Sequence, residues 1–244
     1  MDGYTMSLYA WQKQIKLNCS NKKNIKKIMF KTQSAQWVET ESPIIIPFSI
    51  HSKFHDGEMG EHKVRSLITT IKEHTKAPIT ILLTEEAHVQ VLSLSYESDI
   101  QKASAECFID AKTLANQFKH FFEGCDVQFW CTMISNDPEY QHYKTKIRHI
   151  YETDTQFQQL LYSDAQSTYS AEREQQFPNK EEFIQKSIED LLEQAIYLFI
   201  MSKRGFRFEF YPGKPFSSSE YINRTFLPAE TQLLRITVCL TTQK

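Results

Sequence analysis

A hydroxyl nucleophile follows one of the predicted buried strands. The apolar run Ile44–Ile46 continues through Pro47 and Phe48 to Ser49, and then to a segment with hydroxyl, imidazole and ammonium groups. Ligands of open α/β sheets bind at the carboxyl ends of strands, and a serine there can attack a carbonyl carbon and hold the acyl group as an ester. Because most serines after a strand only form turns or caps, this chemistry needs partner residues elsewhere in the chain.

The sequence lacks the motifs of the common nucleophile and nucleotide enzymes. No G-x-S-x-G surrounds Ser49, and the last histidine of the chain, His149, leaves no late histidine for a hydrolase triad. Neither G-x-G-x-x-G nor a Walker A sequence is present, and the 6 glycines are scattered. These absences disfavour an ordinary α/β-hydrolase, a doubly wound dehydrogenase and a P-loop NTPase, and no cofactor is predicted.

Two other patterns carry weaker interpretations. His51, His55 and His62 lie among acidic residues and offer zinc ligands, but their spacing fits no standard site, so a polar loop is preferred and no metal is predicted. Residues 201–204 read Met-Ser-Lys-Arg, similar to the ATP loop of class I aminoacyl-tRNA synthetases. Residues 51–54 read His-Ser-Lys-Phe, however, where a synthetase needs His-x-Gly-His. Lys203 and Arg204 equally suit a helix C-terminus, which carries partial negative charge.

Strands alternate with long helices along most of the chain. Val64, Leu67, Ile68 and Ile71 recur with helical spacing, and Asp137 followed by Pro138 is typical of a helix start. This alternation predicts an α/β fold with a mostly parallel sheet flanked by helices. The expected helices are 59–76, 100–122, 137–162 and 180–202, a loop is expected over 166–179, and the expected strands are 44–49, 79–83, 127–133, 206–211 and 233–240.

Composition indicates an ordinary globular protein. The 244 residues are 41% hydrophobic, which fits a single domain over 1–244 with a poorly defined segment at 1–40. A formal net charge of −2 means that any contact with a polyanion must be local. Five cysteines without C-x-x-C predict a reduced, cytoplasmic protein, and the apolar run Ala195–Met201 is too short to span a membrane.

Four segments in order resemble tRNA-dependent cyclodipeptide synthases. The first is the strand ending in Ser49, with Ser52 where many members of the family have Asn. The second reads Asp-Pro-Glu-Tyr and ends at Tyr140, and the third is the helical stretch Asp190–Ala195. The fourth is Phe210–Gly213, which is similar to the mark of the Tyr-Pro branch of the family. The resemblance implies a single Rossmann-like domain, similar to the catalytic domain of class I aminoacyl-tRNA synthetases.

The resemblance implies a role for each matching residue. Ser49 attacks the first aminoacyl carbonyl and releases tRNA, the amine of the second aminoacyl group attacks this acyl-enzyme, and the dipeptidyl ester cyclises through its free amine. Asp190 and Gln194 hold the amine, and Tyr140 and Tyr211 position the aminoacyl group or relay a proton. The reaction needs no ATP, metal or cofactor, and the protein is expected to be a monomer. The residues placed beside the substrate are Pro47, Ser52, Glu193 and Pro212.

A tRNA partner requires cations along the path of its backbone. Two groups of basic residues are candidates, although a solvated surface is the alternative for the first group. They are Lys22, Lys23, Lys26 and Lys27 near the N-terminus, and Lys144, Lys146 and Arg148 in a predicted helix. Selection of the substrate side chain is expected from an apolar pocket that the sequence does not locate.

One departure from the family leaves alternatives open. The family usually has Tyr-x-x-x-Glu in the third segment, where this chain has Asp190 and Gln194, and Pro47 stands where Gly is frequent. Gln can form hydrogen bonds but cannot take a proton, and Glu193 points about 100° away on a helix. Either the polar role is reassigned, or the chain carries a substitution, or catalysis is impaired. The second hypothesis is a class I synthetase-like protein that binds tRNA or aminoacyl-tRNA without this chemistry.

Overall fold

A central sheet organises the protein, with strand order β1-β6-β5-β2-β3-β4 in the described part of the chain. The computed structural model describes residues 27–31, 40–48, 61–211 and 215–241. Five strands from β6 to β4 run parallel, and β1 pairs antiparallel with β6. The strands are β1 Lys27–Lys31, β2 Ile44–Phe48, β3 Ile79–Leu83, β4 Asp126–Phe129, β5 Phe208–Tyr211 and β6 Leu234–Thr241. The predicted α/β class with a mostly parallel sheet is confirmed.

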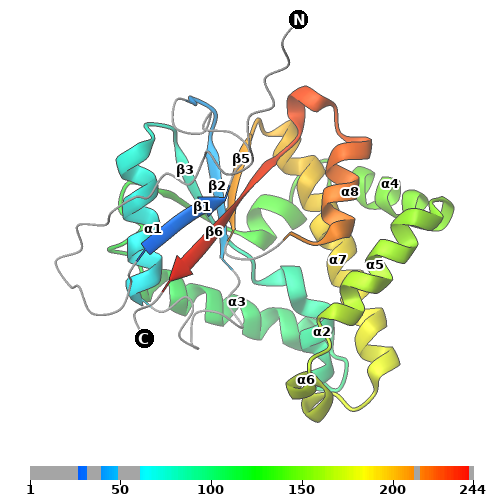
Figure 1. The fold of residues 1–244 in the computed structure, drawn as a ribbon. Coiled ribbons are helices and arrows are strands. Elements are labelled where there is room, and N and C mark those ends of the chain that lie inside the picture. The colour runs from blue at the N-terminus through cyan, green and yellow to red at the C-terminus, as the bar shows by residue number, and fades with distance from the viewer. Residues whose placement is uncertain (1–26, 32–39, 49–60, 212–214, 242–244) are drawn as a thin grey trace, which may run out of the picture.

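Helices cover both faces of this sheet (Figure 1). The α-helices are α1 Glu61–His74, α2 Val89–Ser93, α3 Ile100–Gln117, α4 Tyr140–Thr153, α5 Thr155–Ser167, α6 Ala171–Gln176, α7 Lys180–Lys203 and α8 Ser217–Phe226. Short 3-10 turns span Glu86–His88, Leu94–Tyr96 and Ala229–Thr231, and a π-helical turn spans Cys131–Ser135. No helix in the described part of the chain is both long and apolar enough to cross a bilayer.

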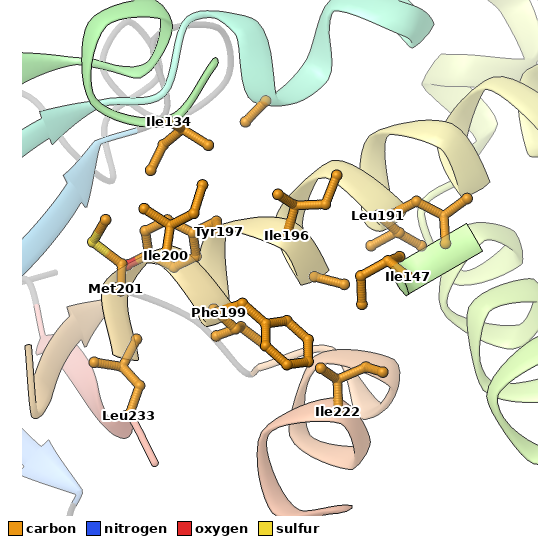
Figure 2. Close-up of a cluster of buried hydrophobic side chains, with 14 of the residues drawn as sticks. Ile134, Ile147, Leu191, Ile196, Tyr197, Phe199, Ile200, Met201, Ile222 and Leu233 are labelled. Carbon is orange, nitrogen blue, oxygen red and sulfur yellow. The ribbon is translucent and has the colours of Figure 1, made fainter. Parts of the chain in front are cut away.

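The sheet separates two hydrophobic clusters. Ile44, Ile46 and Phe48 point to the face covered by α1 and α3, whereas Ile45 points to the face covered by α7. Successive side chains of a strand point to opposite faces, so a strand between two layers is apolar throughout. On the second face the side chains of α7 pack against α4, α5 and α8 (Figure 2). The helix α7 thereby fixes its polar residues relative to the ends of the strands.

Several predicted boundaries are confirmed and others are wrong. The strand at 79–83 and the helix at 180–202 agree with β3 and α7. The helix predicted over 100–122 ends earlier, at Gln117, and three hydrogen-bonded turns follow before Gly124, whose φ is 75°. The strand predicted over 127–133 ends at Phe129 because the Glu85 carboxylate accepts hydrogen bonds from the N–H groups of Trp130 and Cys131, at 3.0 Å each.

Two acidic residues explain the error in the helix predicted over 137–162. Asp137 is not its N-cap: its carboxylate accepts from the N–H of Glu139 at 3.0 Å, and α4 begins after this turn. The helix then breaks at Asp154, which accepts from the N–H of Phe157 at 2.9 Å and caps a new helix, α5. A carboxylate two or three residues before free backbone N–H groups favours a turn or a helix start over a continuing helix.

Three elements lie where the sequence analysis predicted no helix or strand. The strand β1 falls inside the segment 1–40, and α6 falls inside the predicted loop 166–179. The helix α8 follows β5 and packs its buried residue Ile222 against α7. These elements are 5, 6 and 10 residues long, and so short a window gives too few repeats to establish a period from sequence.

Candidate functional site

A pocket of about 40 Å³ lies between the sheet and α7, at the edge where β2 and β3 end. Pro47 of β2 and Thr84, the residue after β3, line it from the sheet. From α7 it is lined by Gln194 and Tyr197. Ligands of open parallel sheets bind at this edge. The other lining residues are Ala87, His88, Trp130, Glu209, Tyr211, Phe216 and Arg235.

Three of the predicted site residues meet in this pocket, namely Pro47, Gln194 and Tyr211. The end of β2 is anchored there, because Thr84 donates to the Phe48 carbonyl from its backbone N at 2.9 Å and from its hydroxyl at 3.0 Å. The side-chain amide of Gln194 forms no hydrogen bond to any residue that the structure describes. It can therefore both donate to and accept from a ligand.

Tyr140 of α4 and Glu193 of α7 form a hydrogen-bonded pair. The Tyr140 hydroxyl lies 2.7 and 2.8 Å from the two Glu193 oxygens and donates a hydrogen bond to this carboxylate. Lys144 forms an ion pair with the same carboxylate at 3.5 Å. Burial, followed by the charge of Glu193, raises the pKa of Tyr140 far above its ordinary value. The phenol therefore stays protonated at neutral pH. Its oxygen accepts from the Lys144 ammonium at 3.5 Å, which leaves one lone pair for a ligand.

Asp190 occupies a different position from the one that the sequence suggested for an amine-holding residue. Its side chain is 2% exposed, and its oxygens accept hydrogen bonds from the N–H groups of Gln90 at 2.9 Å and Val91 at 3.1 Å. These are free N–H groups in the first turn of α2. Burial raises the pKa of Asp190, and the two backbone hydrogen bonds oppose that rise. Asp190 is not among the described lining residues of the pocket, so it holds α2 rather than facing the pocket.

The basic residues of α4 lie on two flanks of the helix, with Lys144 and Arg148 on one and Lys146 on the other. Arg148 forms an ion pair with Glu189, and Lys144 forms one with Glu193. Lys146 is exposed, and its ammonium lies 4.4 Å from the centre of the Phe199 ring. At the end of α7, Lys203 pairs with Glu139 and Arg204 with Asp137. Carboxylates thus already neutralise much of the positive charge in this region.

Several predicted residues lie outside the described part of the chain. Ser49, the proposed nucleophile, directly follows the last described residue of β2. The backbone of Lys27 is described, as the first residue of β1, but its side chain is not. The others outside the described residues are Lys22, Lys23, Lys26, Ser52 and Pro212, together with His51 and His55. In the described part, no group of three His, Cys, Asp or Glu side chains could hold a metal ion.

The pocket also contains charged residues that sequence reasoning missed. Glu209 of β5 and Arg235 of β6 are cross-strand neighbours, and the guanidinium donates to both carboxylate oxygens at 2.8 and 3.0 Å. Glu209 as a whole residue, backbone included, is 1% exposed. The available signal was the charged residues inside two predicted strands, Arg207 and Glu209 in 206–211 and Arg235 in 233–240, where apolar residues are usual.

Comparison with known proteins gives a match in fold but none in sequence. No protein-family model matches the chain, and no curated protein matches it. A cyclodipeptide synthase from Fluoribacter dumoffii superposes with a TM-score of 0.78 and 14% identity, over 90% of this chain and 100% of that one. A cyclodipeptide synthase from Candidatus Glomeribacter gigasporarum, bound to Phe-tRNAPhe, gives a TM-score of 0.65 and 16% identity, over 83% of this chain and 89% of that one.

A third structure connects this fold with aminoacyl-tRNA synthetases. A Mycobacterium tuberculosis protein, described as demonstrating that cyclodipeptide synthetases are related to type I tRNA synthetases, has a TM-score of 0.60 and 9% identity. The match covers 93% of this chain and 100% of that one. Identities this low establish the fold alone. In the described part of the chain, the protein therefore has the α/β fold of the cyclodipeptide synthases.

Proposed function

We propose that this protein is a cyclodipeptide synthase that joins the aminoacyl groups of two aminoacyl-tRNAs into a cyclic dipeptide. The observation that carries the proposal is the pocket at the end of β2, which Gln194 and Tyr211 line and whose edge Thr84 anchors through the Phe48 carbonyl. Ser49 is the next residue in the chain. The match in fold to cyclodipeptide synthases, one of them bound to Phe-tRNAPhe, supports aminoacyl-tRNA as the substrate class.

The proposed reaction exchanges esters and then forms two amides. The Ser49 oxygen bonds to the carbonyl carbon of the first aminoacyl ester, the ester bond to tRNA breaks, and the serine proton passes to the released ribose hydroxyl. The amine of one aminoacyl group then attacks the ester carbonyl of the other, which forms a peptide bond and releases that ester's alcohol. The remaining amine closes the ring on the remaining ester. Each step uses an already activated ester, so no nucleotide is consumed.

The residues around the pocket take distinct roles in this proposal. Gln194 holds the reacting amine through its side-chain amide, and the Tyr211 hydroxyl positions the aminoacyl group. Tyr140, which donates to Glu193, offers its remaining lone pair to an ammonium or amine hydrogen. Asp190 acts at a distance by fixing α2 against α7. Pro47, Ser52, Glu193 and Pro212 complete the surroundings of the substrate.

The tRNA side of the proposal rests on the basic residues. Lys144, Lys146 and Arg148 share α4, which lies beside the pocket helix α7. The lysines at 22, 23, 26 and 27 would extend the contact along the backbone of the tRNA. Because Lys144 and Arg148 already pair with glutamates, Lys146 is the described cation of this group that is most available to a phosphate.

One observation favours a second candidate function. Gln194 stands in the pocket where the family resemblance places a glutamate, and a glutamine cannot act as a base. A protein that binds aminoacyl-tRNA without closing a ring would tolerate this residue. In that case the pocket would hold the aminoacyl group, and no cyclic dipeptide would form.

Expression in a bacterial host tests the two candidates against each other. Mass spectrometry of the medium should detect a cyclic dipeptide with the wild type and none with Ser49→Ala. The matched control is Ser163→Ala, an exposed serine of α5, which should keep the wild-type yield. Folded wild-type protein that releases no cyclic dipeptide, yet shifts aminoacyl-tRNA in a gel, would favour the second candidate.

A further inference from the structure

Two charged side chains, Glu209 and Arg235, line the pocket from a face of the sheet that is otherwise apolar. Along β5, Phe208 and Phe210 point to the cluster under α1 and α3, so Glu209 points to the opposite face, toward α7. Arg235 lies beside it on β6 and donates to both of its oxygens. The side chains of Glu209 and Arg235 are only 2% and 18% exposed. Burying two charges is unfavourable unless their hydrogen bonds are satisfied, so a buried pair at a pocket calls for an explanation.

Tyr197 brings a third polar group to the same place. Its ring stacks on Trp130 at 5.4 Å between centroids, and in Figure 2 its side chain extends from α7 toward the strands. The charges of Glu209 and Arg235 both act on its hydroxyl. The hydroxyl is buried and has no hydrogen-bond partner among the residues that the structure describes. Buried hydroxyls are almost always paired, so this one is placed to meet a group that is not part of the described protein.

The other polar groups of the pocket also have hydrogen-bond donors or acceptors without a partner among the described residues. The guanidinium of Arg235 uses one nitrogen for Glu209, and among the described residues its remaining N–H groups have no hydrogen bond. The Gln194 amide is likewise without a partner in the described part. Donors and acceptors thus converge from α7 and from β6 on one small space.

We propose, resting on the proposed function, that this pocket receives the side chain of an aminoacyl group and selects a short, neutral side chain with a hydroxyl or a carboxamide. Serine, threonine and asparagine are such residues. The expected apolar pocket then has a polar end, whose specificity residues are Tyr197, Glu209 and Arg235.

Charge and size both restrict the ligand. Glu209 and Arg235 neutralise each other, so a charged ligand side chain would be buried without a counter-ion. A neutral hydroxyl or amide can accept from the guanidinium or from Tyr197 and donate to the carboxylate. The volume of about 40 Å³ admits only a few non-hydrogen atoms. An aliphatic side chain would leave the tyrosine hydroxyl and the guanidinium N–H groups unpaired, which is the basis of strong discrimination against isosteres.

The test compares pairs of isosteric aminoacyl groups. Purified protein is mixed with tRNA charged separately with threonine or valine, asparagine or leucine, and serine or alanine. Intact-protein mass spectrometry reports the acyl adduct, and chromatography with mass spectrometry reports the cyclic dipeptide. We expect adduct formation to be about 100-fold or more faster with the polar member of at least one pair.

Two variants connect any preference to this pocket. Tyr197→Phe removes one hydroxyl and should lower the preference for the polar member about 10-fold. Glu209→Leu combined with Arg235→Met removes the buried ion pair and should shift the preference toward the apolar member. The control Tyr162→Phe, at an exposed tyrosine of α5, should leave the preference unchanged.

The outcomes separate this inference from the proposed function. Adducts and cyclic dipeptides that contain only aliphatic or aromatic residues would overturn the polar pocket and leave the proposed function standing. An unchanged preference in Tyr197→Phe, with the double variant folded and also unchanged, would overturn the assignment of these residues. Neither adduct nor cyclic dipeptide from any aminoacyl-tRNA would overturn the proposed function and this inference with it.

Discussion

The hydroxyl of Tyr140 donates to the carboxylate of Glu193, with oxygen–oxygen distances of 2.7 and 2.8 Å, and so ties the start of α4 to the middle of α7. This bond fixes the direction in which the tyrosine lone pairs point. Because a hydrogen bond to an ionised group is stronger than one between neutral groups, it also stabilises the packing of the two helices.

A double-mutant cycle measures this contact. Tyr140→Phe and Glu193→Ala should each lower the free energy of unfolding, and their combined effect should be smaller than the sum by about 1.5 kcal/mol. Urea unfolding of the four proteins gives the coupling energy. Tyr140→Phe combined with Glu152→Ala, an exposed residue of α4, is the control and should be additive. A coupling indistinguishable from the control would mean that the contact is absent in solution.

Asp190 predicts a specific dependence of stability on pH. Burial raises its pKa in the folded protein above the value of about 3.9 in the unfolded chain. In the interval between these pKa values the folded state binds more protons, so the stability that Asp190 contributes is greatest below about pH 4 and falls as pH rises. Asp190→Asn does not titrate there. The difference in unfolding free energy between wild type and Asp190→Asn should therefore shrink from acidic to neutral pH.

The same variant also tests how Asp190 holds α2. The protonated carboxyl keeps a carbonyl and a hydroxyl oxygen as acceptors for the two N–H groups, whereas asparagine turns a donor NH2 group toward one of them, so Asp190→Asn should be destabilised by about 1–3 kcal/mol at low pH. If the difference instead grows with rising pH, then the hydrogen bonds outweigh burial and the pKa of Asp190 in the folded protein is lowered.

Gln194 predicts the pH profile of the proposed reaction. Since a glutamine cannot take a proton, the reacting amine must lose its proton to water, and the rate should rise with pH through the amine pKa of about 8. Gln194→Glu supplies a base, so its profile should extend to lower pH. Initial rates of cyclic dipeptide formation between pH 6 and 9 decide this, and superimposable profiles would show that residue 194 does not act on the amine.

Lys146 and Arg148 should differ in their contributions to tRNA binding. Lys146 is exposed, whereas Arg148 is held by Glu189. Lys146→Gln should therefore lower the slope of log Kd against log salt by about 0.7–0.9, as for the loss of one phosphate contact, and Arg148→Gln should lower it less. Fluorescence titration of labelled tRNA at several salt concentrations gives both slopes. Equal slopes in wild type and Lys146→Gln would place the tRNA elsewhere.

Much of the fold follows from the sequence because long or continuous apolar segments determined it. The continuous apolar runs of β2 and β3 and the wide apolar stripe of α7 have few alternative structures. The break between α4 and α5 did not follow, because a single aspartate at position 154 interrupts a pattern that is helical on both sides.

The site was harder to predict than the fold, for a physical reason. Gln194 and Tyr211 were identified through resemblance, and the structure places both at one pocket. Glu209 and Arg235 are 26 residues apart in sequence and meet only through the pairing of β5 with β6. The hydrogen bond from the Gln90 N–H to the Asp190 carboxylate likewise joins residues that are 100 positions apart in sequence. A local sequence pattern can mark a charge inside a strand as unusual, but it does not show which distant residue that charge contacts.

The stoichiometry of the reaction with purified protein tests the proposed function most directly. Aminoacyl-tRNAs are supplied without ATP, and cyclic dipeptide and uncharged tRNA are quantified together, with non-enzymatic hydrolysis subtracted. A synthase that works through Ser49 should release two tRNAs for each cyclic dipeptide, and Ser49→Ala should give neither product above background. Release of free amino acids without cyclic dipeptide, or equal product from Ser49→Ala and wild type, would contradict the proposed function.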